Sequence, residues 1–456
     1  MSVTHAEPGS RPASKWKLRF GFVLIPVAHS AGMNIITLLA FRFLTDNLAI
    51  SAGAAGLMFA IVKIYDGILD PAVGAWSDNA RTRWGRRLPF LLAGAILMPI
   101  GIAMVFNTPD FTSVIAAQAF LTLALMIHAT AYTALTIPGM AMLVEATDSY
   151  HERTVLMAYR VFGNSAGMLL GSTVPAWLLS IWGDTRYGHS AMSLAIGAIV
   201  LGAGLGAVLL LRDAPRTVPD PETVRQRFSV LTQARLAWAN RPFRQLAVAH
   251  IFVLFGTAIA SMGSAYFSKY VLKFPDSLLG TYFLIVTLGS VGGMPLWVRI
   301  SRRISKKAAY VAAMTGYGGF NLFWLVASGD NSRVLLGGMA LLIGISAGGM
   351  ILCAYSMMSD AVRYDYITSG LRREGAFAGF TTLFDKLAAA AGIALMGLFL
   401  SRMGYVVSRT GAVNQPHTAI LAIIFCVALV PALTMAAAIF AIRNYRLDEA
   451  ALVGGD

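Results

Sequence analysis

Long apolar runs separated by short polar segments dominate the chain from about residue 20 to residue 441. A helix needs roughly 20 apolar residues to cross about 30 Å of hydrocarbon. Runs of about this length cover residues 20–44, 53–77, 89–107, 113–145, 156–181, 190–211, 244–268, 278–298, 308–328, 334–358, 375–401 and 417–441. The pattern therefore predicts an all-α membrane protein with twelve transmembrane helices.

A long polar segment separates the sixth run from the seventh. It contains Pro215, Pro219, Pro221 and several arginines, which is typical of a surface linker. We predict an N-terminal six-helix bundle over residues 1–211, a cytoplasmic linker over 212–243 and a C-terminal six-helix bundle over 244–456. The second and eighth runs end alike, in GAWSDNARTRWGRR and GGMPLWVRISRRISKK. Duplicated halves are typical of secondary transporters, whose substrate site lies between them.

Composition and charge agree with a membrane protein. Hydrophobic residues make up 57% of the chain and charged residues 13%, where a soluble protein has about 25% charged residues. The net charge of +14 does not indicate nucleic-acid binding, because the basic residues lie in short loops between apolar runs. Most of the 36 lysines and arginines fall in both termini and alternate loops. The positive-inside rule then predicts a multi-pass protein of the cell (inner) membrane with both termini in the cytoplasm.

Several classes of protein are not supported. The segment Met1–Lys17 lacks the apolar core of a signal peptide. Cys353 and Cys426 lie inside apolar runs, so a disulfide framework is not expected. No GxSxG, HExxH or P-loop motif is present, so we expect neither an enzyme nor a cofactor.

The second run carries two acidic residues, Asp66 and Asp70. Four-residue spacing places both carboxylates on one helix face, where they repel each other in an apolar medium. A bound sodium ion or a proton would relieve that repulsion. Lys63 can pair with Asp66, and Pro71 frees a backbone carbonyl one turn earlier. A permanent Lys63–Asp66 link between helices is the alternative, but it explains only one of the two acids.

Arg160 in the fifth run and Lys386 in the eleventh are further intramembrane cations. Each can neutralise the acids of the second run or contact a polar or anionic group of a substrate, and both interpretations stay open. His128 and His250 lie in apolar runs without metal-like partners, and we expect them to be hydrogen-bonded packing residues.

Glycines recur every fourth residue in the fifth run, at Gly163, Gly167 and Gly171. Small residues at this spacing let another helix approach closely, so we expect a packing face there.

Charged residues also gather in loops that share the predicted cytoplasmic side. Acids after the fourth and tenth runs, facing arginines after the second and eighth, can form salt bridges that close a cytoplasmic gate. A solvated surface is the alternative. The gate candidates are Asp78, Arg86, Glu145, Asp148, Arg153, Asp360, Asp365 and Arg372.

Three segments together resemble a known family. The segment YDGILDP followed by GAWSDNARTRWGRRLPF is similar to the signature of the glycoside–pentoside–hexuronide:cation symporters of the major facilitator superfamily. EATDSYHERTVLMAYR and YDYITSGLRREGAFAGFTTLFDK resemble two further blocks of that family. The resemblance extends over nearly the whole chain. It implies twelve helices in two pseudosymmetric bundles that work by alternating access.

The resemblance also implies roles for individual residues. Asp66 and Asp70 match the family's cation-binding aspartates, and Thr133 matches a hydroxyl ligand of that site. Lys63, Arg160 and Lys386 match charged positions near the substrate cavity. Leu69 replaces an asparagine that melibiose-carrying members have near the cation, which makes a proton more plausible beside sodium.

The sugar site departs further from melibiose-carrying members. Where those members have a lysine and a sugar-binding aspartate, this chain has His29 and Ser30. Thr136 replaces a second sugar-binding aspartate, and Met140 replaces a tryptophan that stacks on the sugar. Tyr132 also belongs to the expected cavity. The galactoside-binding set is therefore absent, so melibiose is not expected as the substrate.

We therefore expect a monomeric symporter, coupled to Na⁺ or H⁺, for a small organic solute such as a glycoside or another sugar-like compound. One alternative is a carrier of an amphiphile such as a lysolipid, which a vertebrate branch of the family carries with sodium. A non-transporting membrane sensor or scaffold is an alternative from another class. It would need a signalling domain or a long tail, and both terminal tails are short.

Overall fold

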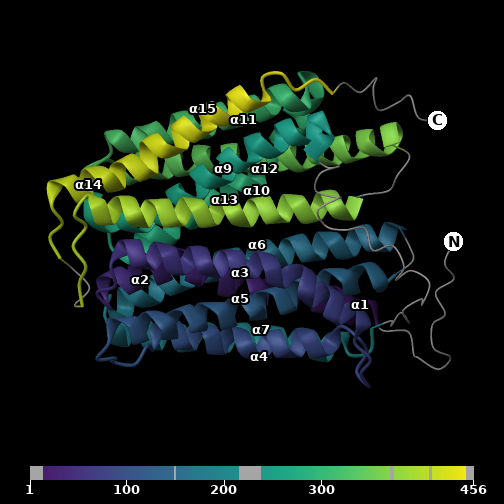
Figure 1. Cartoon of the computed structure of the whole chain (residues 1–456), viewed down its shortest axis with the longest axis horizontal. Helices are drawn as coiled ribbons and strands as arrows, with labels where there is room; N and C mark the ends of the chain where they lie inside the picture. The colour runs from purple at the N-terminus through teal and green to yellow at the C-terminus, as the bar shows by residue number, and fades with distance from the viewer. Residues whose placement is uncertain (1–13, 148–149, 215–237, 370–373, 410–412, 448–456) are drawn as a thin grey trace. The chain divides into compact units, whose positions relative to one another are not determined.

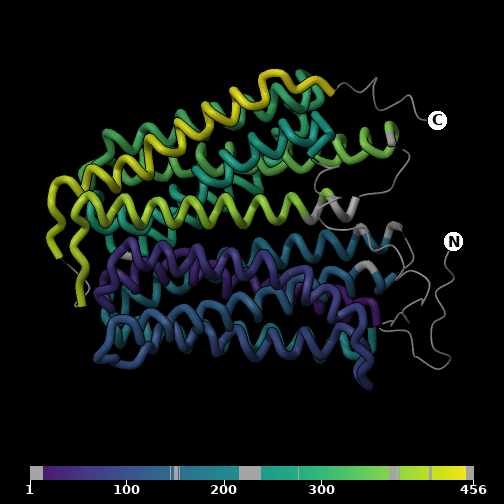
Figure 2. The backbone as a smooth tube through the Cα atoms, in the orientation of Figure 1, coloured from purple at the N-terminus to yellow at the C-terminus, as the bar shows by residue number. Residues whose placement is uncertain are grey.

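The computed structural model describes residues 14–147, 150–214, 238–369, 374–409 and 413–447. All regular structure in these ranges is helical (Figures 1 and 2). The helices form two compact units. The N-terminal unit comprises residues 1–225 and 407–413, and the C-terminal unit comprises residues 226–406 and 414–456. The boundary between residues 225 and 226 lies outside the described residues, and the linker over 212–243 stays a prediction.

The N-terminal unit begins with α1 (Lys15–Ile35), which continues through the π-helical turn η1 (Ile36–Ala40) into α2 (Phe41–Asp46). The helices that follow are α3 (Ala52–Asn79), α4 (Leu88–Phe106), α5 (Val114–Glu145), α6 (Tyr150–Trp182) and α7 (Arg186–Leu211). Polar side chains start three of them, because the oxygens of Ser51, Ser113 and Thr185 accept hydrogen bonds from N–H groups of the first turn. Helix α3 packs against α5, and α1 packs against α6.

The α1–α6 contact depends on the glycine face predicted from the sequence. A Cβ atom added at Gly163 would lie 2.3 Å from the backbone oxygen of Val23, and one added at Gly171 would lie 2.3 Å from that of Ala31. Any larger residue would therefore force the two backbones apart. The predicted packing role is confirmed.

The C-terminal unit has the same helical character. Its elements are α9 (Arg241–Tyr266) with η3 (Phe267–Val271), α10 (Asp276–Arg303), α11 (Lys306–Leu322) with the 3-10 turn η4 (Phe323–Leu325), α12 (Arg333–Ser369), α13 (Glu374–Arg402), and α14 (His417–Ile424) continuing through η5 (Phe425–Leu429) into α15 (Val430–Ile442). Within this unit α9 packs against α13 and α15, and α10 packs against α12.

Eleven of the described helical spans are long and apolar enough to cross a membrane. The twelfth predicted span is α11, which has 17 residues. At 1.5 Å per residue α11 extends about 25 Å. The three residues of η4 add about 6 Å, so the combined element also matches the hydrocarbon thickness. The twelve-helix fold is confirmed.

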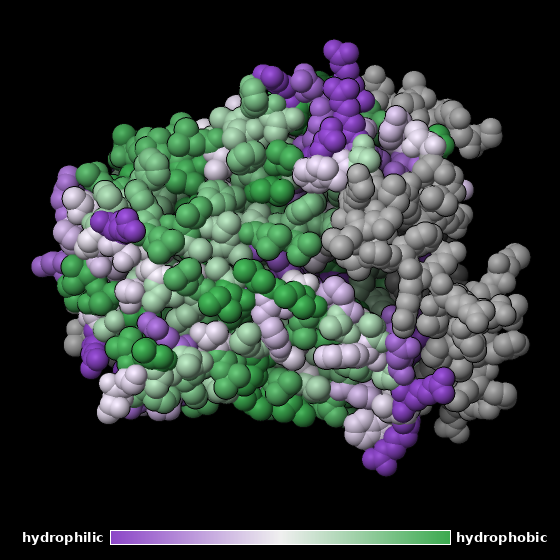
Figure 3. Space-filling view, in the orientation of Figure 1, coloured by the Kyte–Doolittle hydropathy of each residue, from purple (hydrophilic) through white to green (hydrophobic). Residues whose placement is uncertain are grey.

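Many large apolar side chains are exposed on the helices, as a lipid-facing surface requires. Ile68 is 70% exposed and Ile115 is 78% exposed. In Figure 3, hydrophobic side chains cover the middle of the visible helices, and hydrophilic ones gather toward their ends. Such an apolar surface would be a liability in water and is suited to a bilayer.

Candidate functional site

The two acids of the second predicted span lie on α3, which runs uninterrupted through Pro71. Asp66 is buried and Asp70 is half-buried. The neighbouring helix α5 contributes Thr133, which is fully buried. The Thr133 Oγ1 atom lies 3.1 Å from Asp66 Oδ1 and 2.8 Å from Asp70 Oδ1. The structure thus brings together the three residues predicted to bind a cation.

Three oxygen atoms converge at this point. A threonine hydroxyl has one hydrogen to donate, so it serves only one of the two carboxylates at a time. The oxygen of the other carboxylate then faces the hydroxyl oxygen without a hydrogen between them, and the lone pairs of the two oxygens repel each other. A cation placed among these oxygens removes that conflict, and carboxylate and hydroxyl oxygens are ligands that hard cations accept. The three residues therefore have donor atoms that fit a small cation.

The α3–α5 contact is held by further polar pairs. Tyr65 on α3 and Thr130 on α5 share a hydrogen bond of 2.9 Å between their hydroxyls. Lys63 Nζ lies 3.9 Å from Asp66 Oδ2 within α3 itself, at the outer limit of a salt bridge, so this pair does not link two helices and that alternative is wrong. His128 Nε2 bonds the backbone oxygen of Gly32 at 3.0 Å and ties α5 to α1, so the predicted packing role of His128 is confirmed.

A second polar cluster joins α1, α5 and α6. His29 and Ser30 on α1 are both buried. Ser30 Oγ donates to Asn164 Oδ1 at 2.6 Å and lies 3.2 Å from His29 Nδ1. The His29 ring packs edge-on against Tyr132, with ring centroids 5.5 Å apart. Asn164 was not predicted from the sequence.

Asn164 follows Arg160 by four positions on α6, and this spacing is the signal that could have found it. Arg160 is half-buried, and its Nη1 atom is buried without a hydrogen-bond partner among the described residues. The same holds for His29 Nε2. Because an unsatisfied buried polar group is unfavourable, these two nitrogens are candidates for contact with a polar ligand.

The remaining cavity candidates are Thr136, Met140 and Lys386. Thr136 Oγ1 donates to the backbone oxygen of Tyr132, 2.9 Å away in its own helix. Met140 on α5 is 39% exposed. Lys386 lies on α13, in the C-terminal unit.

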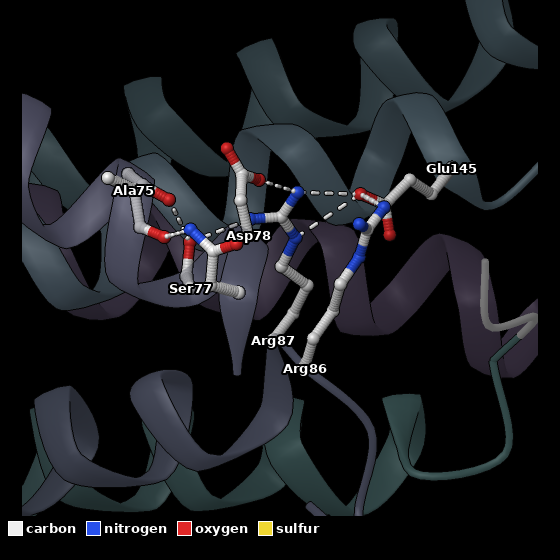
Figure 4. Close-up of polar contacts among 8 residues, drawn as sticks. Ala75, Ser77, Asp78, Arg86, Arg87 and Glu145 are labelled. Carbon is white, nitrogen blue, oxygen red and sulfur yellow. Dashed lines mark hydrogen bonds and ion pairs between the residues drawn. The ribbon is translucent and has the colours of Figure 1, made fainter. Parts of the chain in front are cut away.

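Two adjacent arginines, Arg86 and Arg87, form ion pairs with acidic side chains at one end of the N-terminal unit (Figure 4). Glu145 Oε1 lies 2.7 Å from Arg86 Nη2 and 2.8 Å from Arg87 Nη2. Arg87 is buried, contacts Asp78 Oδ1 at 2.5 Å and donates to Ser77 Oγ at 2.6 Å. Arg87 joins α3, α4 and α5 here, yet it was not among the predicted gate residues.

The other gate candidates form separate contacts. Arg153 donates to the backbone oxygen of Thr147 at 3.1 Å. In the C-terminal unit, Lys306 Nζ lies 2.6 Å from Asp360 Oδ2. Asp365 Oδ1 accepts from Asn240 at 3.3 Å. Asp148 and Arg372 lie outside the described residues. These contacts lie within single units, and the gating role stays a prediction.

A family described as "MFS/sugar transport protein" matches residues 21–449. The chain belongs to this family. A 29% identical relative in Escherichia coli is provisionally named a glycoside/cation symporter, and the match covers 91% of this chain and 88% of that protein. The isoprimeverose transporter of Lactiplantibacillus pentosus is 24% identical over 98% of this chain and 93% of its own length.

Solved structures agree on the fold. An inward-facing, unoccupied bacterial homologue of the human lysosomal transporter Spinster superposes with a TM-score of 0.68, at 16% identity over 96% of this chain and 97% of that one. Members of the MFS/sugar transport family are transporters, so the chain is a multi-pass membrane transporter and not an enzyme. The resemblance seen in the sequence motifs is confirmed.

Proposed function

We propose that this protein is a cation-coupled symporter that carries a glycoside or another small, sugar-like solute by alternating access. The observation that carries the proposal is the buried Thr133 hydroxyl, which lies within hydrogen-bond distance of both Asp66 and Asp70. The names of related proteins, a glycoside/cation symporter and an isoprimeverose transporter, support the same class of solute.

The cation would act by removing repulsion between the carboxylates of Asp66 and Asp70. Either Na⁺, coordinated by the carboxylate and hydroxyl oxygens, or H⁺, bound to one carboxyl, achieves this. Occupancy of the cation site would favour the solute-binding form of the carrier. Coupling is then the difference in cation affinity between the two orientations of the cavity.

The solute would bind at the polar cluster of His29, Ser30, Asn164 and Arg160, beside the ring of Tyr132. Sugar hydroxyls both donate and accept hydrogen bonds, which matches the mixture of donors and acceptors here. The unpartnered Arg160 Nη1 suits an oxygen or an anionic substituent of the solute. Lys386 is proposed as a further solute contact from the C-terminal unit.

Counterflow and uphill uptake in proteoliposomes, with a panel of glycosides, test the coupling role. We expect Asp66→Asn and Asp70→Asn each to abolish accumulation driven by a Na⁺ or H⁺ gradient, with protein levels maintained. Asp110→Asn is the matched control, because Asp110 is a highly exposed acid that pairs with Arg186 away from the site. Uphill uptake at the wild-type level in both site variants would refute the proposal.

A carrier of amphiphiles is the second candidate function, and an apolar cavity in the C-terminal unit favours it. This cavity of about 260 Å³ is lined mostly by apolar residues such as Phe267, Leu272 and Trp324, and Arg333 is also among its lining residues. An acyl chain with a polar head has matching chemistry. Lysolipids in the same uptake panel separate the candidates, because only an amphiphile carrier moves them against a gradient.

The orientation and assembly of the chain are also proposals. The distribution of lysines and arginines supports cytoplasmic termini in the cell membrane. That the carrier works as a monomer is a separate proposal. If both termini are cytoplasmic, single cysteines introduced near either end should react with a membrane-impermeant reagent only after the cells are opened. Both native cysteines are buried, so they should contribute little background reaction.

A further inference from the structure

The C-terminal unit contains a buried acid–base pair that the sequence analysis did not recognise. His250 on α9 and Asp385 on α13 lie with Nε2 and Oδ1 3.1 Å apart. The side chain of His250 is 9% exposed and that of Asp385 is 29% exposed. Both residues belong to helices long and apolar enough to span the membrane. His250 therefore has a carboxylate partner and is more than a packing residue.

The charge of this pair depends on one proton. Among the described residues, His250 is the only group within salt-bridge distance of Asp385. A neutral imidazole beside an ionised carboxylate leaves a net charge of −1 inside an apolar span. Uptake of one proton makes the pair neutral overall, which a low-dielectric surrounding favours. His250 Nδ1 is buried and has no hydrogen-bond partner among the described residues, so it is an available position for that proton.

A second histidine–aspartate pair in the same chain shows the contrast. His189 Nε2 lies 2.8 Å from Asp184 Oδ1, in the N-terminal unit. Asp184 also faces Arg42, whose Nη2 lies 3.7 Å from its Oδ2. Arg42 supplies a positive charge beside the Asp184 carboxylate, so balancing that carboxylate does not require a proton on His189. Among the described residues, Asp385 has no basic residue other than His250 within salt-bridge distance.

The other ionisable groups around His250 are few. The ring of Tyr355 on α12 lies edge-on, with its centroid 6.4 Å from that of the His250 ring. Lys386 follows Asp385 on α13, and η5 contributes the buried Cys426. Helix α15 has no ionisable residue. The remaining ionisable residues of α9 and η3 lie more than one helical turn from His250: Arg241, Arg244, Tyr266, Lys269 and Tyr270.

We propose that His250 and Asp385 form a proton-binding couple that loads and releases one proton. The proton comes from water that reaches the partly exposed carboxylate. It forms an O–H bond on Asp385 or an N–H bond on His250 Nδ1, and the couple changes from −1 to 0. The couple belongs to the C-terminal unit, whereas Asp66 and Asp70 belong to the N-terminal unit. It makes the carrier pH-sensitive even if the coupling ion at Asp66 and Asp70 is sodium.

Proton binding can be measured on the purified full-length protein without any solute. Nitrogen-15 NMR of labelled histidines from about pH 5 to pH 8 covers the range in which imidazoles normally titrate. The signals that disappear in His250→Asn identify its ring, and we expect that ring to pass from neutral imidazole to imidazolium. In Asp385→Asn the midpoint of this change should move, because the nearby negative charge is lost.

Two controls keep the outcome clear. An asparagine at position 385 has nearly the same size and shape as aspartate, so this variant should fold, and gel filtration checks it. His189→Asn should leave the titration of His250 intact. A His250 signal that does not change over this pH range, or a midpoint unaffected by Asp385→Asn, would overturn the proposal. Since no solute or ion gradient is used, failure here is distinct from failure of the symport proposal.

Discussion

Replacing Thr133 with valine tests the candidate cation site most directly. Valine keeps the branched shape of the fully buried side chain but removes the hydroxyl oxygen. That oxygen lies 3.1 Å and 2.8 Å from the nearest carboxylate oxygens of Asp66 and Asp70. The substitution therefore leaves two carboxylates and no shared hydroxyl at the site.

The expected magnitude follows from the lost polar contact. A hydrogen bond to a charged group contributes roughly 1.5–3 kcal/mol, which corresponds to a change of roughly 10- to 150-fold in an equilibrium constant. A bound Na⁺ loses a ligand oxygen, so Thr133→Val should weaken Na⁺ binding by about this factor. A fall in Na⁺ affinity of this size therefore supports a role for the Thr133 hydroxyl as a ligand of Na⁺.

Calorimetric Na⁺ titration of the purified protein measures this effect. Thr133→Ser keeps the hydroxyl and should bind nearly as the wild type does. Thr136→Val is the matched control, because the Thr136 hydroxyl donates to the backbone oxygen of Tyr132 in its own helix. If Thr133→Val binds Na⁺ as the wild type does, or if Thr136→Val weakens Na⁺ binding equally, the site is wrongly assigned.

Two further predictions concern stability and are checked by thermal unfolding in detergent micelles. Glu145→Gln should destabilise the N-terminal unit by about 2 kcal/mol, because the buried Arg87 loses the negative charge of Glu145 and keeps only an uncharged amide oxygen as acceptor. An unchanged unfolding temperature would contradict the proposed role of this ion pair. Gly171→Ala should cost about 1–3 kcal/mol, because the new Cβ would meet the backbone of Ala31. Gly202→Ala should be neutral or stabilising, since its Cβ would meet nothing within 4 Å, and equal losses in both glycine variants would refute the packing argument.

Much of the site was predictable because its signals are local. The four-residue spacing of Asp66 and Asp70 places both carboxylates on one helix face whatever surrounds them. Thr133 came only from the family resemblance, since its helix offers several hydroxyls and spacing alone does not choose among them. Arg87 and Asn164 were missed because each depends on a partner in another helix. Asp385 was missed for the same reason, since its importance appears only when His250 faces it.

The sequence by itself determined which segments cross the membrane, because hydropathy and helix length act over one short stretch of chain at a time. It also determined where unfavourable intramembrane charges occur. Only the tertiary structure decided which charges are balanced. Asp184 has an arginine partner, whereas His250 is the only described ion-pair partner of Asp385. Electrostatic energy depends on distance in space, and helices far apart in the sequence set those distances when they pack.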